Sequence, residues 1–209
     1  MSKHPLWGKM TEQHLTDEAL MLAYQGGSTE AFEELFARYR TRLFTYLRRS
    51  LGDPVQAEDL LQTLFLRVHR ARGTYQPAAA FSTWIYTIAR HLVRDARDKE
   101  RAEAARRDTT RQSWRETNEE PVSLNERIGS EHLAPETLRQ RKDIATRLQQ
   151  ALLSLSLEQR EVILLSKYEG LHFSEIAAIL GCSVPAAKVR AFRALKALRA
   201  ALGERKDLC

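Results

Sequence analysis

Cysteine is scarce in this chain of 209 residues, which contains only Cys182 and Cys209. Two cysteines this far apart have neither the spacing of a metal site nor the number for a disulfide framework. We therefore expect no metal, no cofactor and a reducing cytoplasm. A redox or metal role for Cys209 is the less favoured alternative, since a lone terminal thiol is more often inert.

Long apolar runs are absent as well. No segment approaches the roughly 18 residues that a membrane span needs, so direct membrane insertion is not expected. Residues 1–14 have no apolar core and do not resemble a secretory signal. The sequence therefore predicts a cytoplasmic protein.

Glycine and proline are also few, with nine and six residues, and β-branched runs are rare. This composition favours an all-α fold, and the length allows one large or two small domains. The net charge is +6. A net positive charge of this size suggests a polyanionic partner but does not identify one.

Residues 170–202 have the pattern of a helix-turn-helix. A first helix is predicted over Phe173–Leu180, and Gly181 ends it because glycine tolerates left-handed backbone geometry. Ser183 is a suitable N-cap for a second helix, and Pro185 fits its first turn. The turn between them has helix-turn-helix length.

The second of these helices has two distinct faces. Its apolar stripe contains Val184, Ala187, Ala191, Leu195, Leu198 and Leu202. The residues assigned to DNA contact are Ala186, Val189, Arg190, Arg193 and Lys196 opposite the stripe, and Lys188 on its flank. Small residues and arginines on an outward face suit a major groove. The alternative is a solvated basic face on an ordinary helical bundle.

A second basic helix is predicted from residue 81, with Ser82 as its N-cap. Its apolar face contains Trp84, Ile85, Ile88 and Leu92, and its other face contains Arg90, Arg94, Arg97 and Arg101. A stripe of one sign about four turns long fits a phosphate backbone. A solubilising face is the alternative, but such faces usually mix charges of both signs.

Three further helices are predicted over 17–25, 29–51 and 54–70. In the last of these, Asp53 is the N-cap and Pro54 the first residue. Phe65 lies among its inward apolar residues. Glu58, Asp59 and Gln62 face solvent or a partner, although plain surface polarity would also explain each of them.

Residues 102–134 are highly charged and lack periodicity, which is typical of a flexible linker. The chain is therefore divided into a tail (1–16), a helical domain (17–101), this linker, a helix-turn-helix domain (135–203) and a second tail (204–209). Pro135 begins the second domain, and Ser156 with Gln159 forms a capping box inside it.

Three segments in this order resemble a bacterial RNA polymerase sigma factor of the extracytoplasmic-function (ECF) group. Residues 57–68, AEDLLQTLFLRV, are similar to the family's polymerase-binding helix. Residues 81–99, FSTWIYTIARHLVRDARDK, are similar to the segment that melts and recognises the −10 element. Residues 155–199 are similar to the domain that recognises the −35 element. The resemblance covers the chain from about Asp17 to Leu202.

The resemblance implies a binding subunit and not an enzyme. Its partners would be core RNA polymerase, promoter DNA and an anti-sigma factor, the last of which could hold it at the inner membrane. Polymerase contact would come from Glu58, Asp59, Gln62 and Phe65. The −10 set would be Tyr75, Gln76, Trp84, Arg90, Arg94 and Arg97, with Tyr75 and Gln76 receiving an unstacked base. The −35 set would be the six DNA-contact residues of the last helix.

The sequence also leaves two other functions open. A stand-alone helix-turn-helix regulator would need a dimer interface, and the second basic helix argues against it. A DNA-processing enzyme would need a nucleophile or a set of metal-binding carboxylates. The compact acidic group Asp53, Glu58 and Asp59 is better explained by helix capping and surface polarity.

Overall fold

The computed structural model describes residues 15–110 and 135–203. Within those ranges the protein contains eight α-helices and no strand, so the predicted all-α fold is confirmed. The helices are α1 (Asp17–Gln25), α2 (Thr29–Leu51), α3 (Pro54–Ala71), α4 (Phe81–Thr110), α5 (Pro135–Ser154), α6 (Leu157–Ile163), α7 (Phe173–Leu180) and α8 (Val184–Leu202). Both tails, Cys209 and residues 111–134 of the predicted linker lie outside the described residues.

Side-chain caps fix the start of most helices. The Thr16 hydroxyl accepts the Ala19 N–H at the start of α1, and the Ser28 hydroxyl accepts the Ala31 N–H in α2. The Asp53 carboxylate accepts two N–H groups of α3, including that of Val55 at 2.8 Å. Each cap satisfies backbone donors that a helix cannot pair internally.

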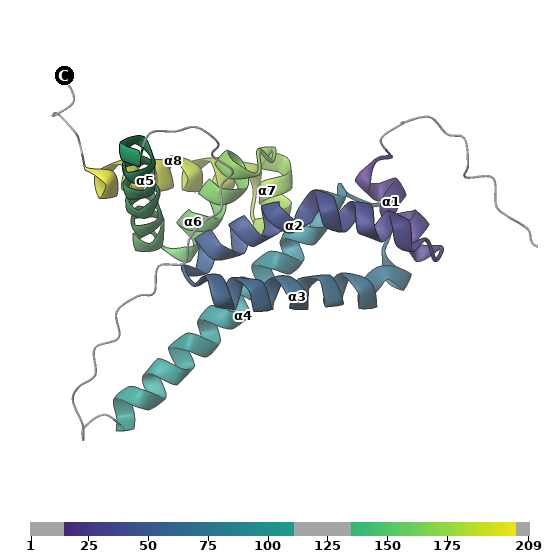
Figure 1. Ribbon diagram of the computed structural model, residues 1–209, viewed down its shortest axis with the longest axis horizontal. Coiled ribbons are helices and arrows are strands. Elements are labelled where there is room, and N and C mark those ends of the chain that lie inside the picture. The colour runs from purple at the N-terminus through teal and green to yellow at the C-terminus, as the bar shows by residue number, and fades with distance from the viewer. Residues whose placement is uncertain (1–14, 111–134, 204–209) are drawn as a thin grey trace, which may run out of the picture.

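Helices α1 to α4 pack around one core, in which α2, α3 and α4 contact one another (Figure 1). Its largest fully buried side chains include Tyr39, Met21, Leu43 and Leu64. Asp17 ties α1 to α2, because its carboxylate pairs with Arg38 at 2.7 Å and accepts the Tyr39 hydroxyl at 2.6 Å. This unit contains the expected polymerase and −10 residues.

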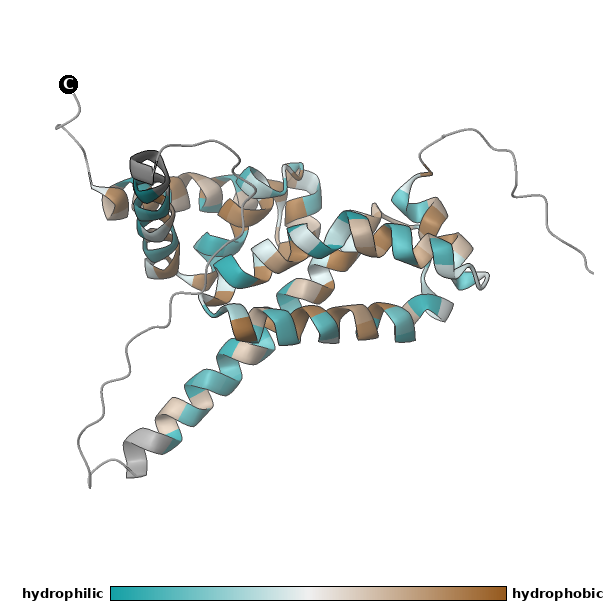
Figure 2. Ribbon diagram, viewed as in Figure 1, coloured by the Kyte–Doolittle hydropathy of each residue, from teal (hydrophilic) through white to brown (hydrophobic). Residues whose placement is uncertain are grey.

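Helix α4 differs from the prediction at both ends. It begins at Phe81, whose N–H donates to Glu18 of α1 at 2.7 Å, so the prediction of Ser82 as N-cap is wrong. A carboxylate from another helix thus supplies the acceptor. At the other end α4 continues to Thr110, past the predicted domain end at residue 101. Its hydrophilic second half projects away from the other helices (Figure 2).

Helices α5 to α8 form the second group. The Ser156–Gln159 capping box starts α6, and a π-helical segment, Leu164–Tyr168, follows it. Gly181, with φ of 65°, ends α7, and Ser183 caps α8. Helix α8 packs on α5, α6 and α7 through its buried residues Ala187, Ala191 and Ala194. The predicted helix-turn-helix is therefore present.

The two groups of helices share a continuous core. Buried residues of α2 to α4 and of α6 to α8 belong to one cluster, and α7 packs directly on α4. Helix α5 meets the end of α2 at Gly52, where an added Cβ would lie 2.9 Å from Leu153 Cδ1. Gly52 also has a φ of 89°, so both its conformation and this close approach require glycine. Helix α4 therefore lies against the helix-turn-helix group.

Candidate polymerase and nucleic-acid interfaces

The outer face of α3 is polar and open. Glu58, Asp59 and Gln62 are exposed, as the sequence predicts, and Leu66 beside them is 56% exposed. Phe65 is buried beneath this face, with its ring 4.6 Å from that of Phe36. Phe65 therefore supports the helix from the core side, while the other three can meet a partner directly.

The segment before α4 does not offer an open stacking face. Tyr75 is only 4% exposed, and its ring lies 5.1 Å from Trp84 and 6.1 Å from Phe81. Burial raises the pKa of the Tyr75 phenol. Tyr75 therefore has no open face for an unstacked base in this arrangement, because the aromatic cluster already holds its ring. Gln76 is exposed and Trp84 is half-buried.

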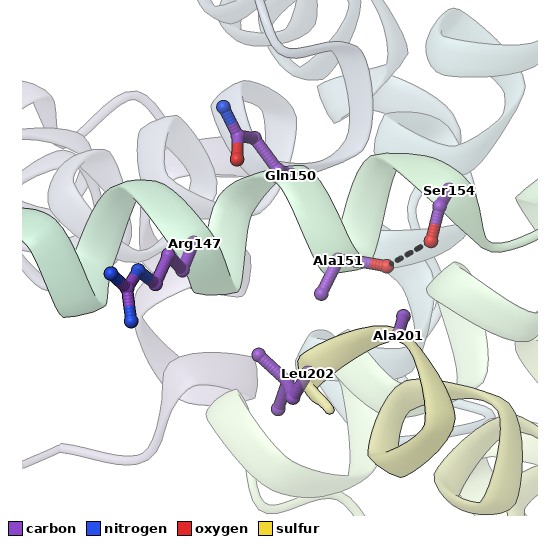
Figure 3. A pocket seen from close by; sticks show the side chains of 6 residues that line it. All are labelled: Arg147, Gln150, Ala151, Ser154, Ala201 and Leu202. Atoms are coloured by element: carbon purple, nitrogen blue, oxygen red, sulfur yellow. Dashed lines mark hydrogen bonds between the residues drawn. The ribbon is translucent and has the colours of Figure 1, made fainter. Parts of the chain in front are cut away.

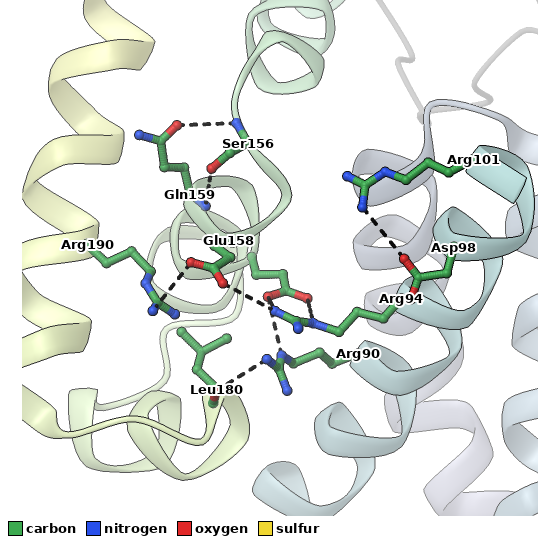
Figure 4. A network of polar contacts seen from close by, with 10 residues as sticks. Arg90, Arg94, Asp98, Arg101, Ser156, Glu158, Gln159, Leu180 and Arg190 are labelled. Carbon is green, nitrogen blue, oxygen red and sulfur yellow. Dashed lines mark hydrogen bonds and ion pairs between the residues drawn. The ribbon is translucent and has the colours of Figure 1, made fainter. Parts of the chain in front are cut away.

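The arginines of α4 are not a free basic stripe, which corrects a second prediction. Arg90 is 9% exposed and donates to Glu161 of α6 and to the Leu180 carbonyl of α7, each at 3.3 Å. Arg94 also donates to Glu161, through both Nε and Nη2 at 3.3 Å (Figure 4). The hydrogen bond with Glu161 is the main reason that the pKa of Arg94 is raised.

The other two arginines of the stripe have partners as well. Arg97 donates to the carbonyls of Ser50 and Leu51 at 3.1 and 3.0 Å, so it caps the C-terminus of α2. Arg101 pairs with Asp98 at 3.6 Å on the exposed part of α4. A helical periodicity shows which side chains share a face, but not which distant element covers that face.

Helix α8 presents most of its predicted face to solvent. Ala186, Lys188, Val189, Arg193 and Lys196 are exposed. Arg190 is the exception, because it is half-buried and pairs with Glu158 of α6 at 3.4 Å. It flanks the Ala187–Ala191–Ala194 seam and does not lie opposite it. Phe192, next to Arg193 in the sequence, is 71% exposed.

Two family models match the two groups of helices. Residues 35–103 match Sigma-70 region 2, and residues 145–198 match Sigma-70, region 4. The chain is 37% identical over 187 residues to RNA polymerase sigma factor CarQ of Myxococcus xanthus, covering 88% of this chain and 96% of that protein. It is 31% identical over 192 residues to ECF RNA polymerase sigma-E factor of Escherichia coli K12, covering 90% and 95% respectively. The chain belongs to the ECF group of RNA polymerase sigma factors.

Solved structures agree with this sigma-factor fold. CnrH, in complex with the cytosolic domain of CnrY, has a TM-score of 0.63 and 25% identity, covering 89% of this chain and 96% of that one. The sigma factor RpoE of Bartonella quintana, in complex with the anti-sigma factor NepR, has a TM-score of 0.66 and 22% identity, covering 85% and 100%. The protein is thus a promoter-directing transcription initiation factor and not an enzyme, as the sequence predicts.

Sequence reasoning missed three acidic residues that join the two regions of this sigma factor. Glu161 is fully buried between Arg90 and Arg94, and Glu158 pairs with Arg94 at 3.9 Å as well as with Arg190 of its own region. Glu169, at the end of the π-helical segment, accepts Arg42 Nε at 3.0 Å and also the Tyr86 hydroxyl. The sequence does contain one signal for this contact: Glu161 lies on the inner face of an amphipathic helix. A carboxylate buried there needs a partner from another element.

An open groove of about 530 Å³ lies between α5 and the end of α8, lined by Arg147, Gln150, Ala151, Ser154, Ala201 and Leu202 (Figure 3). Among the described residues, no group of three or more His, Cys, Asp or Glu side chains could hold a metal ion. Over the same residues, no helix is long and apolar enough to cross a membrane.

Proposed function

We propose that the outer face of α3 is the surface with which this sigma factor binds core RNA polymerase. The observation that carries this assignment is the open row of Glu58, Asp59 and Gln62, with the exposed Leu66 beside it. A polar row around an apolar side chain resembles the rim and centre of a protein interface. Phe65 contributes by holding α3 on α2.

The −10 element is assigned to the first half of α4 and the segment before it. Gln76 is exposed and Trp84 is half-buried at this surface, so both can meet an unstacked base. Arg90 and Arg94 would hold phosphates once their present partners release them. Arg97 caps α2 and contributes to DNA binding mainly by fixing the position of α4.

The −35 element is assigned to the exposed face of α8. Lys188 and Lys196 suit phosphate contacts, whereas Arg193 can pair with a guanine edge and Val189 can meet a thymine methyl. Ala186 allows close approach of the helix to the groove. Arg190 joins this set when Glu158 no longer holds it. Both assignments follow the proposed division into a −10 domain (17–101) and a −35 domain (135–203). Helix α4 extends beyond the first of these ranges into the segment between the domains.

Regulation by an anti-sigma factor is proposed from the similar proteins. CnrH is bound to the cytosolic domain of CnrY in its structure, and RpoE is bound to the anti-sigma factor NepR. A protein that acts on bacterial core polymerase works in the cytoplasm, and sequestration at the inner membrane by such a partner would keep it from the polymerase.

The α3 assignment is tested with the double variant Asp59→Arg and Gln62→Ala. Both side chains are exposed, so the fold should persist while a reversed charge meets the polymerase surface. We expect affinity for core polymerase to fall by about tenfold or more, since opposed like charges are costly at an interface. The measurement is fluorescence titration of the labelled full-length chain with core polymerase.

The control is Glu33→Arg, a charge reversal at an exposed position of α2, on a different helix from the variant side chains. It should leave polymerase affinity unchanged within about twofold, because exposed charges act weakly at a distance in salt. Circular dichroism checks that both variants keep the wild-type helix content. Unchanged affinity of a folded double variant would remove α3 from the polymerase interface.

A further inference from the structure

The basic face of α4 is covered by region 4 of the same chain. We call the five side chains involved the Glu161 cluster: Glu158 and Glu161 of α6, Arg90 and Arg94 of α4, and Arg190 of α8 (Figure 4). The Glu161 carboxylate is 0% exposed and accepts three N–H groups from two arginines, all at 3.3 Å. Two arginines sharing one anion is the arrangement with which proteins bind phosphate.

Polar contacts on both sides of the cluster hold the two regions together. Glu169 accepts Arg42 and Tyr86, and Ser82 of α4 donates to Glu175 of α7 at 3.1 Å. On the other side, Arg160 of α6 donates to the Ser50 carbonyl of α2.

Arg160 is held firmly in this position. It also donates to the Leu152 and Leu153 carbonyls, at 2.8 and 2.7 Å. Burial, with a smaller contribution from the charge of Arg97, lowers the pKa of Arg160 to about 10, so it is still charged at neutral pH. The contact between the regions therefore combines a shared apolar core with several matched charges.

Burial makes the Glu161 carboxylate decisive for this contact. A buried ion pair adds little net stability over an apolar contact, but removing one partner leaves an unpaired buried charge, which is strongly unfavourable. Arg90 in particular has almost no access to solvent in this arrangement. Loss of the Glu161 charge should therefore favour separation of the two regions.

We propose that region 4 inhibits −10 binding in the free sigma factor, with Glu161 occupying Arg90 and Arg94 in place of the DNA phosphates. The proposal rests on the assignment of these arginines to the −10 element. Promoter binding at −10 then requires the regions to separate. The −35 face of α8 stays accessible throughout, because Lys188, Arg193 and Lys196 are exposed in the closed arrangement.

The first test measures the separation directly in the full-length chain. Spin labels are placed at Ala37→Cys of α2 and Ala200→Cys of α8, both exposed, with Cys182 and Cys209 replaced by serine. Double electron–electron resonance should give one narrow distance for the otherwise wild-type chain. Glu161→Gln should raise the ratio of separated to closed molecules by at least about tenfold.

The matched control is Glu103→Gln, the same chemical change on the exposed second half of α4, outside the contact between the regions. Glu103 is 47% exposed and pairs with Lys99 of the same helix, and exposed pairs contribute little, so its effect should stay within about twofold. Glu169→Gln, which removes the other buried carboxylate of the contact, provides a second route to separation. Distances unchanged in both Glu161→Gln and Glu169→Gln would overturn the proposal.

The second test measures whether separation uncovers the arginines. The probe is a short single-stranded DNA of mixed sequence, and the background carries Lys188→Ala and Arg193→Ala to reduce binding by α8. Glu161→Gln should raise affinity for the probe by about tenfold, in proportion to the separated fraction. Addition of Arg94→Gln should abolish that gain.

The two tests distinguish failure of the inhibition from failure of the −10 assignment. If the regions separate but affinity for the probe does not rise, α4 is not the masked DNA surface. The proposal then fails because the −10 assignment on which it rests is wrong. If the regions do not separate, the Glu161 cluster does not control closure, whatever α4 binds.

Discussion

At the scale of single residues, two buried tyrosines show how neighbours decide the role of a side chain. The rings of Tyr46 and Tyr86 meet edge to face, 5.4 Å apart, and both are almost fully buried. The Tyr86 hydroxyl donates to the Glu169 carboxylate, whereas the Tyr46 hydroxyl has no hydrogen-bond partner in the structure. Burial raises the pKa of both phenols above the usual range.

The same substitution should therefore have different effects at these two positions. Tyr86→Phe should lower the free energy of unfolding by about 1.5–3 kcal/mol, because a buried carboxylate loses a donor. Tyr46→Phe should be neutral or stabilising, because it removes a hydroxyl that has no partner. Urea unfolding followed by circular dichroism measures both, and equal destabilisation by the two variants would contradict this account.

The residue scale is also where prediction from sequence was least complete. Arg90 and Arg94 were correctly placed on one face of their helix, but their acceptor Glu161 lies about 70 residues away in the chain. Tyr75 looked available in its loop, yet Trp84 and Phe81 enclose its ring. Neither covering partner follows from a local pattern, because each depends on tertiary packing.

At the scale of helices, local signals were sufficient. The predicted ranges 17–25, 29–51 and Phe173–Leu180 agree with α1, α2 and α7. Side-chain caps start α1 and α2, and left-handed glycines end α2 and α7, so these signals lie within a few residues of sequence. Helix α4 was less predictable, since its first N–H is satisfied by Glu18 of α1. The exposed face of α8 follows from its periodicity, apart from Arg190.

Helix α8 should contain two kinds of DNA contact that can be separated experimentally. Lys188→Ala should weaken binding to all −35 sequences and reduce the salt-dependence slope by about one unit, as expected for a phosphate contact. Arg193→Ala should cost roughly 1–3 kcal/mol at one base pair and relax the preference there. The measurement is binding of the reconstituted holoenzyme to a library of −35 variants at several salt concentrations.

A uniform loss of affinity across the library for Arg193→Ala would show that this arginine contacts only the backbone. Sequence preference would then have to come from Val189 or another residue of the exposed face. Ala201→Ser, at an exposed position of α8 outside the proposed DNA face, is the control and should change neither slope nor preference.

At the scale of the whole molecule, two regions expected to be independent share one core. Composition predicts a linker between the two helical groups, but it carries no information on whether the groups touch. The contact depends on shape as well as charge, since Gly52 leaves room for Leu153. Matched shape and buried charge together should hold the regions without a covalent link.

This expectation can be tested by inserting a specific protease site between residues 120 and 121. After cleavage, the two fragments should still elute together in gel filtration, and moderate salt should not separate them because buried pairs are weakly screened. The same cleavage in the Glu161→Gln chain should release two separate fragments. Separation of the cleaved wild-type fragments would mean that the contact needs the covalent connection to persist.

Pairing of Glu161 with Arg90 and Arg94 has a consequence for how this sequence can be inherited. A recombination event within residues 111–134 would join one region 2 to another region 4 and could part the arginines from their carboxylate. Both halves of such a hybrid would fold, and the hybrid would recognise two promoter elements. It would lack the matched charges that hold region 4 against region 2. In descendants that keep the closed arrangement, a change at position 90, 94 or 161 must be matched by changes at its partners. The two regions therefore evolve as one unit.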